Sequence, residues 1–396
     1  MSVTIIGGGI GGLALANALQ RVGIEFQLFE QAPELTEVGA GIGLSRGALQ
    51  LLEVLELGAG VRARGHRLER VYLADRMLRV RRVLPPDIEG VCIHRALLID
   101  TLASRLPEER IHLSRRVTRV RSHPDRAEID FEDGTTIESS CVVAADGIHS
   151  AVRRSLFPDV RIRWIGQTIW RGITRMPMPE PVAGSYVEVW DEGLRFLAVP
   201  INSEETFWLA VKPAPPGGQD DPATVRDDLL HLFRNYHPAL LDLVRHSRNF
   251  LRSDMGDLGP PNRPWYHRRV ALLGDAIHAT TPNLAQGGCQ AIEDAVCLAL
   301  CMRAADCDPI RAFQRYQRLR QAKVSYVVNV SWRFGVAAHS ANPITYHLAR
   351  LVLERAPAAI VRRQERLLND LSYLREVDTE GVMFGNGKPA GERARV

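Results

Sequence analysis

Several features are missing from the sequence, and each absence excludes a class of protein. The six cysteines form no C-x-x-C pair and no His-rich zinc spacing, so we expect buried free thiols and neither structural disulfides nor a metal site. The most apolar late stretch, residues 324–361, is interrupted by Arg333, Asn342 and Pro343 before about 20 apolar residues accumulate. A membrane-spanning helix is therefore not expected. This stretch indicates either a pair of amphipathic helices over the core or a peripheral membrane contact through Arg333, Arg350, Arg355, Arg362 and Arg363.

A strong excess of one charge is also missing, since 50 basic and 46 acidic residues give a net charge of +4. The arginines are scattered rather than gathered with aromatic residues into a basic patch, so nucleic acid is not an expected partner. No leader-like segment precedes the first predicted strand at residue 3, which leads us to expect a cytoplasmic protein. With 396 residues, 45% of them hydrophobic, the chain can form two or three domains around a substantial core.

The first thirty residues carry the most informative pattern that is present. Residues 3–30 indicate a strand, a glycine turn, a helix and a second strand that ends in a carboxylate. In the G-x-G-x-x-G motif, Gly7 permits the tight turn, Gly9 lets backbone approach a pyrophosphate, and Gly12 lets the helix pack close to the strand. Glu30 follows Gly12 by 18 positions, close to the spacing of an acid that binds a ribose hydroxyl. The order predicts a Rossmann-like site with a diphosphate at the helix N-terminus.

Two later segments each place an acid after a buried strand. Residues 141–145 are continuously apolar or small, follow a predicted meander, and end at Asp146-Gly147. Residues 269–274 form a second buried run, followed by Asp275, a glycine pair and a long helix over 289–302. Because ligands of doubly wound sheets bind beyond the carboxyl ends of the strands, one extended cofactor that touches all three regions is the economical interpretation.

Between these segments, from about residue 160 to 212, strands follow one another without helices. We predict an antiparallel sheet that forms one wall of an organic-substrate pocket, followed by two helices over 222–246. On this sheet, Arg195 either faces the pocket, where it can pair with a substrate anion, or points outward. Packing is the expected role of any single tryptophan among the four in this region, which are Trp164, Trp170, Trp190 and Trp208.

Taken together, these motifs resemble the single-component flavoprotein aromatic hydroxylases, the group A FAD monooxygenases of para-hydroxybenzoate hydroxylase fold. The G-x-G-x-x-G motif, the D-G motif at Asp146-Gly147, and the G-D motif at Gly274-Asp275 with HATTPNLAQGGCQAIEDA occur in the family's order over nearly the whole chain. The last of these motifs is most similar to the corresponding sequence in the salicylate hydroxylase, urate hydroxylase and zeaxanthin epoxidase branches. The resemblance implies an α/β protein with a Rossmann-like FAD-binding domain, an antiparallel β-sheet substrate domain and C-terminal helices. It also implies that NAD(P)H and dioxygen serve to hydroxylate an aromatic or heteroaromatic small molecule through a flavin C4a-hydroperoxide.

The resemblance further implies which residues bind the cofactor. The N-terminal glycines would approach the FAD pyrophosphate, Glu30 the adenosine ribose, and Asp275 the ribityl chain. Asp146 would serve both FAD and the nicotinamide cofactor, with Arg153 as an electrostatic partner, and Arg95 would touch the flavin side. The implied set comprises Gly9, Gly11, Gly12, Glu30, Gln31, Gly41, Arg46, Arg95, Asp146, Gly147, Arg153, Asp275, Pro282, Gly287 and Gly288.

Arg195, His278 and Pro282 are the implied candidates for catalysis. Pro282 would border the isoalloxazine edge where oxygen reacts, and Gly287 and Gly288 would direct the helix dipole at the flavin pyrimidine. His278 would take part in proton traffic near the flavin, or it caps a turn. No catalytic base stands out, and the sequence does not distinguish NADH from NADPH because it has no second G-x-G-x-x-G motif.

The chain departs from the family's sequence pattern at Ser45-Arg46-Gly47, where members of the family usually have Pro-Asn. Arg46 therefore contacts a cofactor phosphate, gates access, or is a plain surface arginine. We expect a monomer or homodimer. The expected division is a discontinuous FAD-binding domain over 1–75, 90–160 and 265–325, a substrate domain over 76–89 and 161–264, a helical region over 326–384, and a mobile tail over 385–396.

Two other classes of protein share part of this pattern. A related FAD enzyme, such as an epoxidase, a halogenase or an isoprenoid-chain reductase, would keep the FAD motifs, although a halogenase would carry a W-x-W-x-x-P segment that is missing here. A non-catalytic dinucleotide-binding protein would keep the glycine turn but would not need Asp146 together with Gly274-Asp275.

Overall fold

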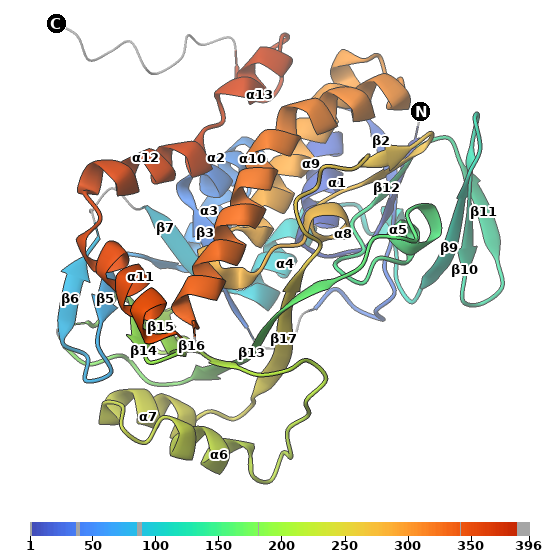
Figure 1. Cartoon of the computed structure of the whole chain (residues 1–396). Helices are drawn as coiled ribbons and strands as arrows, with labels where there is room; N and C mark the ends of the chain where they lie inside the picture. The colour runs from blue at the N-terminus through green and yellow to red at the C-terminus, as the bar shows by residue number, and fades with distance from the viewer. Residues whose placement is uncertain (1, 37–39, 85–88, 181, 341, 386–396) are drawn as a thin grey trace, which may run out of the picture.

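A computed structural model describes residues 2–36, 40–84, 89–180, 182–340 and 342–385. The predicted tail over 385–396 lies outside the described residues, apart from Gly385. Two sheets form the body of the protein, and the long helix α10 crosses above them in Figure 1. The hairpin region β9 to β11 projects at the other end, on the right of the same view.

Among the described residues, the nucleotide-binding half contains a sheet of six strands in the order β18-β19-β12-β1-β2-β8. The strands other than β18 run parallel, and Ile5 of β1 pairs with Leu28 of β2 and Val143 of β12. Val3, Ile5 and Ile6 are almost fully buried, as expected for a parallel strand covered on both faces. The strands are β1 Ser2–Ile6, β2 Glu25–Phe29, β8 Ile111–His112, β12 Val142–Ala144, β18 Tyr266–His267 and β19 Val270–Leu272.

Helices α1 and α9 pack against each other beside this sheet. Buried residues occur all round α9, which marks it as an interior helix. Two small sheets, β3-β7-β4 and β11-β10-β9, flank the parallel sheet. The elements of this half are α1 Ile10–Arg21, β3 Gly41–Ser45, α2 Arg46–Val54, α3 Gly58–Arg64, β4 His66–Arg67, β7 Gly90–His94, α4 Arg95–Ala103, a 3-10 turn Glu108–Arg110, β9 Val117–Ser122, β10 Ala127–Phe131, β11 Thr136–Ser139, α5 Ala151–Leu156, α8 Asp275–His278, a 3-10 turn Pro282–Leu284 and α9 Gly287–Ala304.

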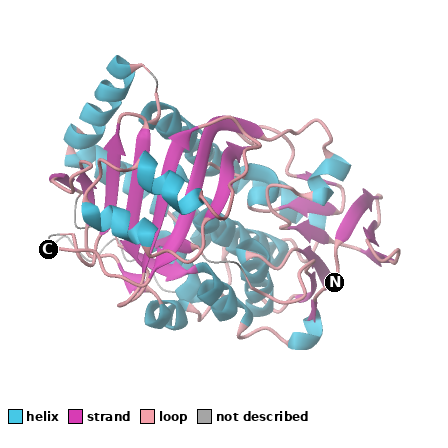
Figure 2. Cartoon of the chain, turned by 90° about the horizontal axis from the view of Figure 1, so that it is seen from below, coloured by secondary structure: helices cyan, strands magenta, loops and turns pink. Residues whose placement is uncertain are grey.

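The second half is built on a sheet whose seven described strands have the order β17-β13-β16-β15-β14-β5-β6. Alternation along β15 separates its two faces: Phe196 and Ala198 pack toward α6 and α7, whereas Leu197 and Val199 face the nucleotide-binding half. Figure 2 shows this sheet from below, with short helices across its face. The elements are β5 Val71–Ala74, β6 Val80–Val83, β13 Arg163–Thr174, β14 Tyr186–Asp191, β15 Leu194–Pro200, β16 Thr206–Pro213, α6 Val225–Leu232, α7 Pro238–Arg245 and β17 Leu251–Asp257.

Strand β5 shows where the division drawn from the sequence differs from the structure. That division assigns residues 71–74 to the FAD-binding domain, whereas they form a strand of the large sheet. Val71 pairs in parallel register with Tyr186, and Leu73 with Glu188. The difference arises because this pairing joins segments far apart in the sequence, which local periodicity cannot reveal.

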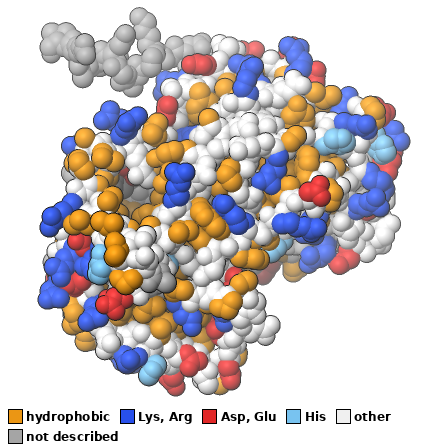
Figure 3. All heavy atoms as spheres, in the orientation of Figure 1, with side chains coloured by type: hydrophobic (Ala, Val, Ile, Leu, Met, Phe, Trp, Pro, Cys, Tyr) orange, Lys and Arg blue, Asp and Glu red, His pale blue; other side chains and the backbone are white. Residues whose placement is uncertain are grey.

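The C-terminal helices also begin earlier than the division at residue 326 suggests. Helix α10 runs without a break over Pro309–Ala338, because its buried stripe, which includes Tyr316, Val324 and Val328, continues across that position. It is followed by α11 Pro343–Arg355, α12 Ala358–Asn369 and α13 Ser372–Val377. Hydrophobic and basic side chains alternate over the α11 and α12 edge, at the left of Figure 3. Over the described ranges, no helix is long and apolar enough to cross a membrane.

A largely buried ion cluster joins α10 to α9. Arg320 Nε donates to Asp294 Oδ1 at 2.7 Å, and its Nη1 donates to Glu293. Lys323 Nζ also lies 2.7 Å from Glu293 Oε1, and His278 is hydrogen-bonded to Asp294 Oδ2. Although burial alone raises the pKa of the Asp294 carboxyl, the charges of His278 and Arg320 lower it to about 2. The cluster therefore fixes the loop after β19 against the two long helices.

Candidate active site

A cavity of about 1160 Å³ lies between the carboxyl ends of the parallel sheet and one face of the seven-stranded sheet. It is lined by the glycine turn after β1, the end of β2, residues 145–149, residues 273–275, and the start of α9. Typical pockets for drug-sized ligands measure about 300–1,000 Å³. The structure thus brings the three sequence motifs together at one cavity that is large enough for an extended cofactor.

The glycine turn leaves open space where the sequence predicts a pyrophosphate. Gly7 has φ +104°, and a Cβ there would lie 2.5 Å from the Ala145 carbonyl oxygen. No heavy atom lies within 4 Å of the position of a Cβ on Gly9, which precedes the first residue of α1. Gly11 also lines the cavity, whereas Gly12 lies behind it, where a Cβ would be 1.9 Å from the Gly7 carbonyl oxygen. The backbone of the turn is therefore tightly constrained, and the N–H groups that begin α1 adjoin the open space.

Glu30 closes one end of the cavity with its carboxylate held by backbone. Gly8 N–H donates to Glu30 Oε2 at 2.5 Å, and Ala32 N–H donates to Oε1 at 2.8 Å. Gln31 lines the cavity beside it. Each carboxylate oxygen keeps further acceptor capacity, so the predicted ribose contact is compatible with these bonds.

Asp146 and Gly147 line the middle of the cavity. Asp146 Oδ2 accepts a hydrogen bond from Val152 N–H at 3.3 Å, whereas its Oδ1 is buried without a partner among the described residues. Burial raises the pKa of the Asp146 carboxyl, against the hydrogen bonds from Ser150 and the following backbone. Arg153 is not on the cavity wall, because its Nη1 donates to the Ala276 carbonyl oxygen at 2.9 Å and ties this turn to α8.

Asp275 and Arg95 face the same part of the cavity from different elements. Burial raises the pKa of Asp275, while the nearby charges of His278 and Arg95 oppose that shift. Burial likewise lowers the pKa of Arg95, and Asp275 opposes it. A Cβ on Gly287 would lie 3.8 Å from Asp275 Oδ1, so the first turn of α9 adjoins the acid.

Three further candidates complete the cavity wall: Gly41, Pro282 and Gly288. A Cβ on Gly41 would lie 2.6 Å from Cγ of Phe207, so only glycine fits between β3 and the large sheet. Pro282 opens a one-turn 3-10 helix that ends before Ala285, which has φ +51°. The turn places Pro282 and the α9 N-terminus on the wall together.

The structure places Arg46, Arg195 and His278 away from the cavity wall. Arg46 begins α2, where its charge lowers the pKa of Glu365 against the larger raising effect of burial. His278 is buried, with its ring 5.3 Å from that of Trp265. Arg195 shares the face of β15 that carries Leu197 and Val199, but it is buried in an ion pair with Glu188. The roles of these residues stay predictions.

The apolar wall of the cavity comes from the large sheet, as the strand pattern predicts. Three of the four tryptophans of that region are buried elsewhere, whereas Trp164 lines the cavity and is 43% exposed. Sequence reasoning missed the side chains that form the wall, because alternation alone does not say which face of a sheet meets the cofactor domain. They are Ile169, Arg171, Tyr186, Leu197, Val199, Phe207, Leu209, Ser253, Asp254 and Met255.

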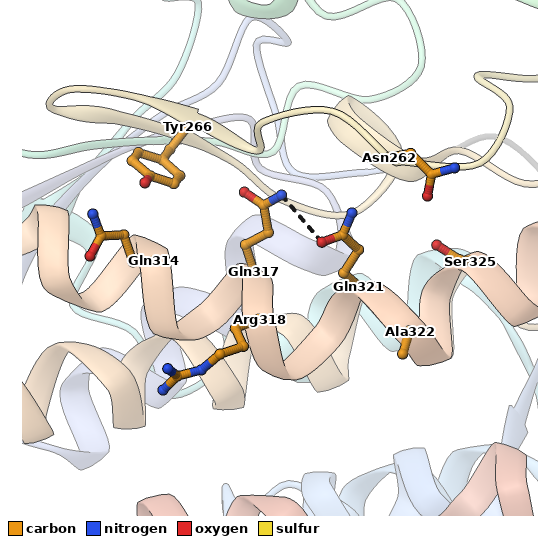
Figure 4. Close-up of a pocket in the computed structure, with 8 residues that line it drawn as sticks. All are labelled: Asn262, Tyr266, Gln314, Gln317, Arg318, Gln321, Ala322 and Ser325. Atoms are coloured by element: carbon orange, nitrogen blue, oxygen red, sulfur yellow. Dashed lines mark hydrogen bonds between the residues drawn. The ribbon is translucent and has the colours of Figure 1, made fainter.

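A second, more open groove of about 610 Å³ lies between α10 and residues 262–266 (Figure 4). Two of the glutamines that line it, Gln317 and Gln321, already have backbone partners. Gln317 accepts from Trp265 N–H at 3.0 Å and donates to the Arg263 carbonyl oxygen at 3.0 Å, and Gln321 donates to Pro261 at 3.1 Å. These bonds hold the segment before β18 against α10, so we place the chemistry in the larger cavity.

The fold and the cavity define a Rossmann-type dinucleotide-binding enzyme whose cofactor site opens onto an antiparallel sheet. Residues 1–323 match the family model described as FAD binding domain, and the chain belongs to that family. It is 36% identical to the aurachin C monooxygenase/isomerase of Stigmatella aurantiaca, over 85% of this chain and 89% of that protein. It is 32% identical to 3-hydroxybenzoate 6-hydroxylase 1 of Aquipseudomonas alcaligenes, over 83% and 87% of the two chains.

The solved structure of Klebsiella pneumoniae HpxO complexed with FAD and uric acid superposes with a TM-score of 0.85 and 26% identity, over 93% of this chain and 96% of that one. A salicylate hydroxylase substrate complex, at 23% identity and a TM-score of 0.77, shares the fold. The predicted fold and class are thereby confirmed: the chain is an FAD-dependent monooxygenase with the para-hydroxybenzoate hydroxylase fold.

Proposed function

We propose that this monooxygenase hydroxylates an aromatic or heteroaromatic small molecule, with NAD(P)H as reductant and dioxygen as the source of the inserted oxygen. One observation carries the proposal: a single cavity is lined both by the glycine turn of α1 and by the apolar face of the large sheet. An apolar wall with few polar groups suits a flat organic ring. The names of the relatives support the same class, since they act on a hydroxybenzoate or hold uric acid.

The residues at the glycine end fit FAD. The space beside Gly9 and the unpartnered, buried Asp146 Oδ1 both provide for a ligand rich in phosphate and hydroxyl groups. Bound FAD supplies the redox and oxygen-activating chemistry that side chains lack. We assign Gly9 and Gly11 to the pyrophosphate, Glu30 to the adenosine ribose and Asp275 to the ribityl chain.

The chain's own contribution near the ring end is electrostatic. The first turn of α9 begins at Gly287 and Gly288 on the cavity wall, so its unsatisfied N–H groups provide partial positive charge. Such a terminus stabilises nearby negative charge by about 0.3–2 kcal/mol, and Arg95 adds a full positive charge at the same cavity. The surrounding apolar side chains exclude water, which strengthens both effects.

Arg195 and His278 act, in this proposal, as positioning residues. Arg195 Nη1 donates to Asn283 Oδ1 at 2.7 Å, and Asn283 Nδ2 donates to Thr281 Oγ1 at 3.0 Å. These bonds hold the turn that presents Pro282 to the cavity. His278, through Asp294, holds the loop that carries Asp275.

We also propose a cytoplasmic location and a monomer or homodimer. All six cysteines are free thiols and five of them are buried, which suits a reducing compartment. Size-exclusion chromatography with light scattering measures the oligomeric state directly.

The proposed function is tested on the purified holoenzyme. We expect a yellow protein whose NADH or NADPH oxidation is accelerated by at least one member of a panel of hydroxybenzoates, quinolones and purines. Under ¹⁸O-labelled dioxygen, the product should carry one labelled oxygen. A protein that retains FAD but oxidises neither nucleotide faster with any aromatic, or whose product is unlabelled, contradicts the proposal.

A further inference from the structure

Arg171 is the one arginine among the described residues of the large sheet that line the cavity, where most of its neighbours are apolar and Tyr186, Ser253 and Asp254 are polar. It lies on β13 two residues after Ile169, on the same face, and both line the cavity. Its neighbours across the sheet are Leu209 on β16 and Leu251 on β17. A guanidinium on such a wall needs a partner, because burying an uncompensated charge is costly.

The chain satisfies only part of the hydrogen-bonding capacity of the Arg171 guanidinium. Arg171 Nη2 donates to Ser253 Oγ at 2.7 Å, while its Nε is buried without a hydrogen-bond partner. Among the described residues, no carboxylate forms an ion pair with Arg171. Asp254 on β17 also lines the cavity, but its carboxylate accepts from Thr168 Oγ1 at 2.9 Å and from Gly217 N–H at 2.6 Å.

Arg195 provides the contrast on the same sheet. Its guanidinium donates to Glu188 and to Asn283, so both its charge and its hydrogen bonds are satisfied inside the protein. An incoming anion would have to displace Glu188 to bind there. Arg171 lines the cavity and has no ion pair among the described residues, so no carboxylate of the chain has to be displaced there.

The electrostatics at Arg171 also favour a negative ligand. Burial lowers the pKa of Arg171, and the positive charge of Arg95 lowers it further. The guanidinium groups of Arg95 and Arg171 therefore repel each other at one cavity, and Asp275 opposes the pKa shift at Arg95 only. An anion beside Arg171 would offset both the burial and the repulsion.

We propose that Arg171 binds an anionic oxygen of the substrate, either a carboxylate or an acidic enol or phenol oxygen, and so holds the aromatic ring against the sheet. This inference rests on the proposed function, because it needs an aromatic substrate in this cavity. The planar fork of a guanidinium suits two oxygens of one ligand, with Ser253 fixing its orientation. The substrate class narrows to aromatic compounds with an acidic oxygen beside the ring.

The test compares charged ligands with neutral ones of the same shape. Three pairs are titrated into the oxidised holoenzyme, with binding followed by the change in flavin absorbance: salicylate and salicylamide, quinoline-2-carboxylate and its amide, and 2,4-dihydroxyquinoline and its 4-methyl ether. The first two pairs report a carboxylate, and the third reports an acidic enol. We expect the wild-type protein to prefer the anionic member of at least one pair roughly ten- to hundredfold, as for a charge-assisted hydrogen bond.

Variants of Arg171 assign that preference to the residue. Arg171→Gln should remove the preference, and Arg171→Lys should retain part of it because it keeps the charge but loses the fork. Arg234→Gln, at an exposed arginine after α6, is the matched control and should leave the preference unchanged. The FAD content and circular dichroism of each variant establish that it is folded and loaded.

Three outcomes overturn the inference. One is a wild-type protein without preference for any anionic member, and another is an Arg171→Gln variant that keeps the preference. The third is an Arg171→Gln variant that loses FAD and binds charged and neutral ligands equally more weakly, which would assign Arg171 to cofactor binding. Failure of the proposed function looks different, because wild-type NAD(P)H oxidation would then respond to no aromatic compound at all.

Discussion

Replacing Arg320 by methionine tests whether the buried ion cluster between α9 and α10 stabilises the fold. Arg320 is fully buried and donates hydrogen bonds to Glu293, Asp294 and Gln290. Methionine fills much of the same volume but leaves two buried carboxylates without their shared cation. Removing one partner of a buried pair costs about 3–5 kcal/mol. We expect the lower end of that range, since Lys323 still contacts Glu293 and His278 still contacts Asp294.

The measurement is urea unfolding of the FAD-saturated protein at pH 7, with the fold followed by circular dichroism. The control is Arg175→Met, which breaks an ion pair to Glu204 whose two side chains are 76% and 60% exposed, and which should cost less than about 1 kcal/mol. Adding Glu293→Gln and Asp294→Asn to Arg320→Met should recover part of the loss, because the uncompensated charges are then removed. An Arg320→Met loss as small as that of the control would falsify this reasoning.

Lowering the pH should reduce the difference in unfolding free energy between Arg320→Met and the wild type. The folded-state pKa of Asp294 is about 2, below its usual 3.8, so this group contributes stability above pH 3.8 that is lost as the pH falls toward 2. In Arg320→Met the pKa of Asp294 rises because the charge of Arg320 is gone. The ionised Asp294 then contributes less to the stability of the variant, so less stability is lost in acid. A difference in unfolding free energy that stays constant or grows as the pH falls from about 5 toward 2 contradicts the assignment.

Further predictions concern the glycine turn and a buried histidine. Gly12→Ala should prevent folding or FAD uptake, because its Cβ would lie 1.9 Å from a carbonyl oxygen. Gly9→Ala should fold and lose only FAD affinity, because its Cβ would point into open space. Circular dichroism and FAD titration distinguish the two variants, and equal behaviour of both contradicts the prediction. Burial and the charge of Arg195 lower the pKa of His339 to about 4. The unfolded chain therefore binds a proton first as the pH falls below about 6.5, and stability should drop by on the order of 3 kcal/mol by pH 4. His339→Gln should flatten that part of the unfolding free energy against pH, and an unchanged profile would exclude His339 as its source.

Local patterns predicted the cofactor half of the molecule well. The apolar runs that become β1, β12 and β19 are each followed by an acid or a glycine turn, and parallel pairing brings their carboxyl ends to one cavity. The physical reason is that a parallel strand is buried on both faces, so its sequence is recognisable without knowledge of its neighbours. The fold class and the three motifs follow from such segments.

The sequence could not predict which side chains on different strands contact one another. Arg195 and Glu188 are seven positions apart on paired antiparallel strands, and the alternation of β15 allowed either face for the arginine. Arg171 belongs to no sequence motif, and its importance depends on its having no ion pair with a carboxylate among the described residues. Charge compensation is a property of three-dimensional neighbours, which periodicity does not encode.

The parallel pairing of β5 with β14 has a consequence for how the protein is made. Val71 meets its partner Tyr186 only after 115 more residues have been synthesised, and at about 5–20 residues per second this takes roughly 6–23 s. During that interval β5 can pair only with β6, so the edge of β5 that later meets β14 stays open. A cell that translates residues 75–185 slowly would prolong this exposure, so synonymous codon choice in that stretch should alter the yield of folded protein without altering its sequence.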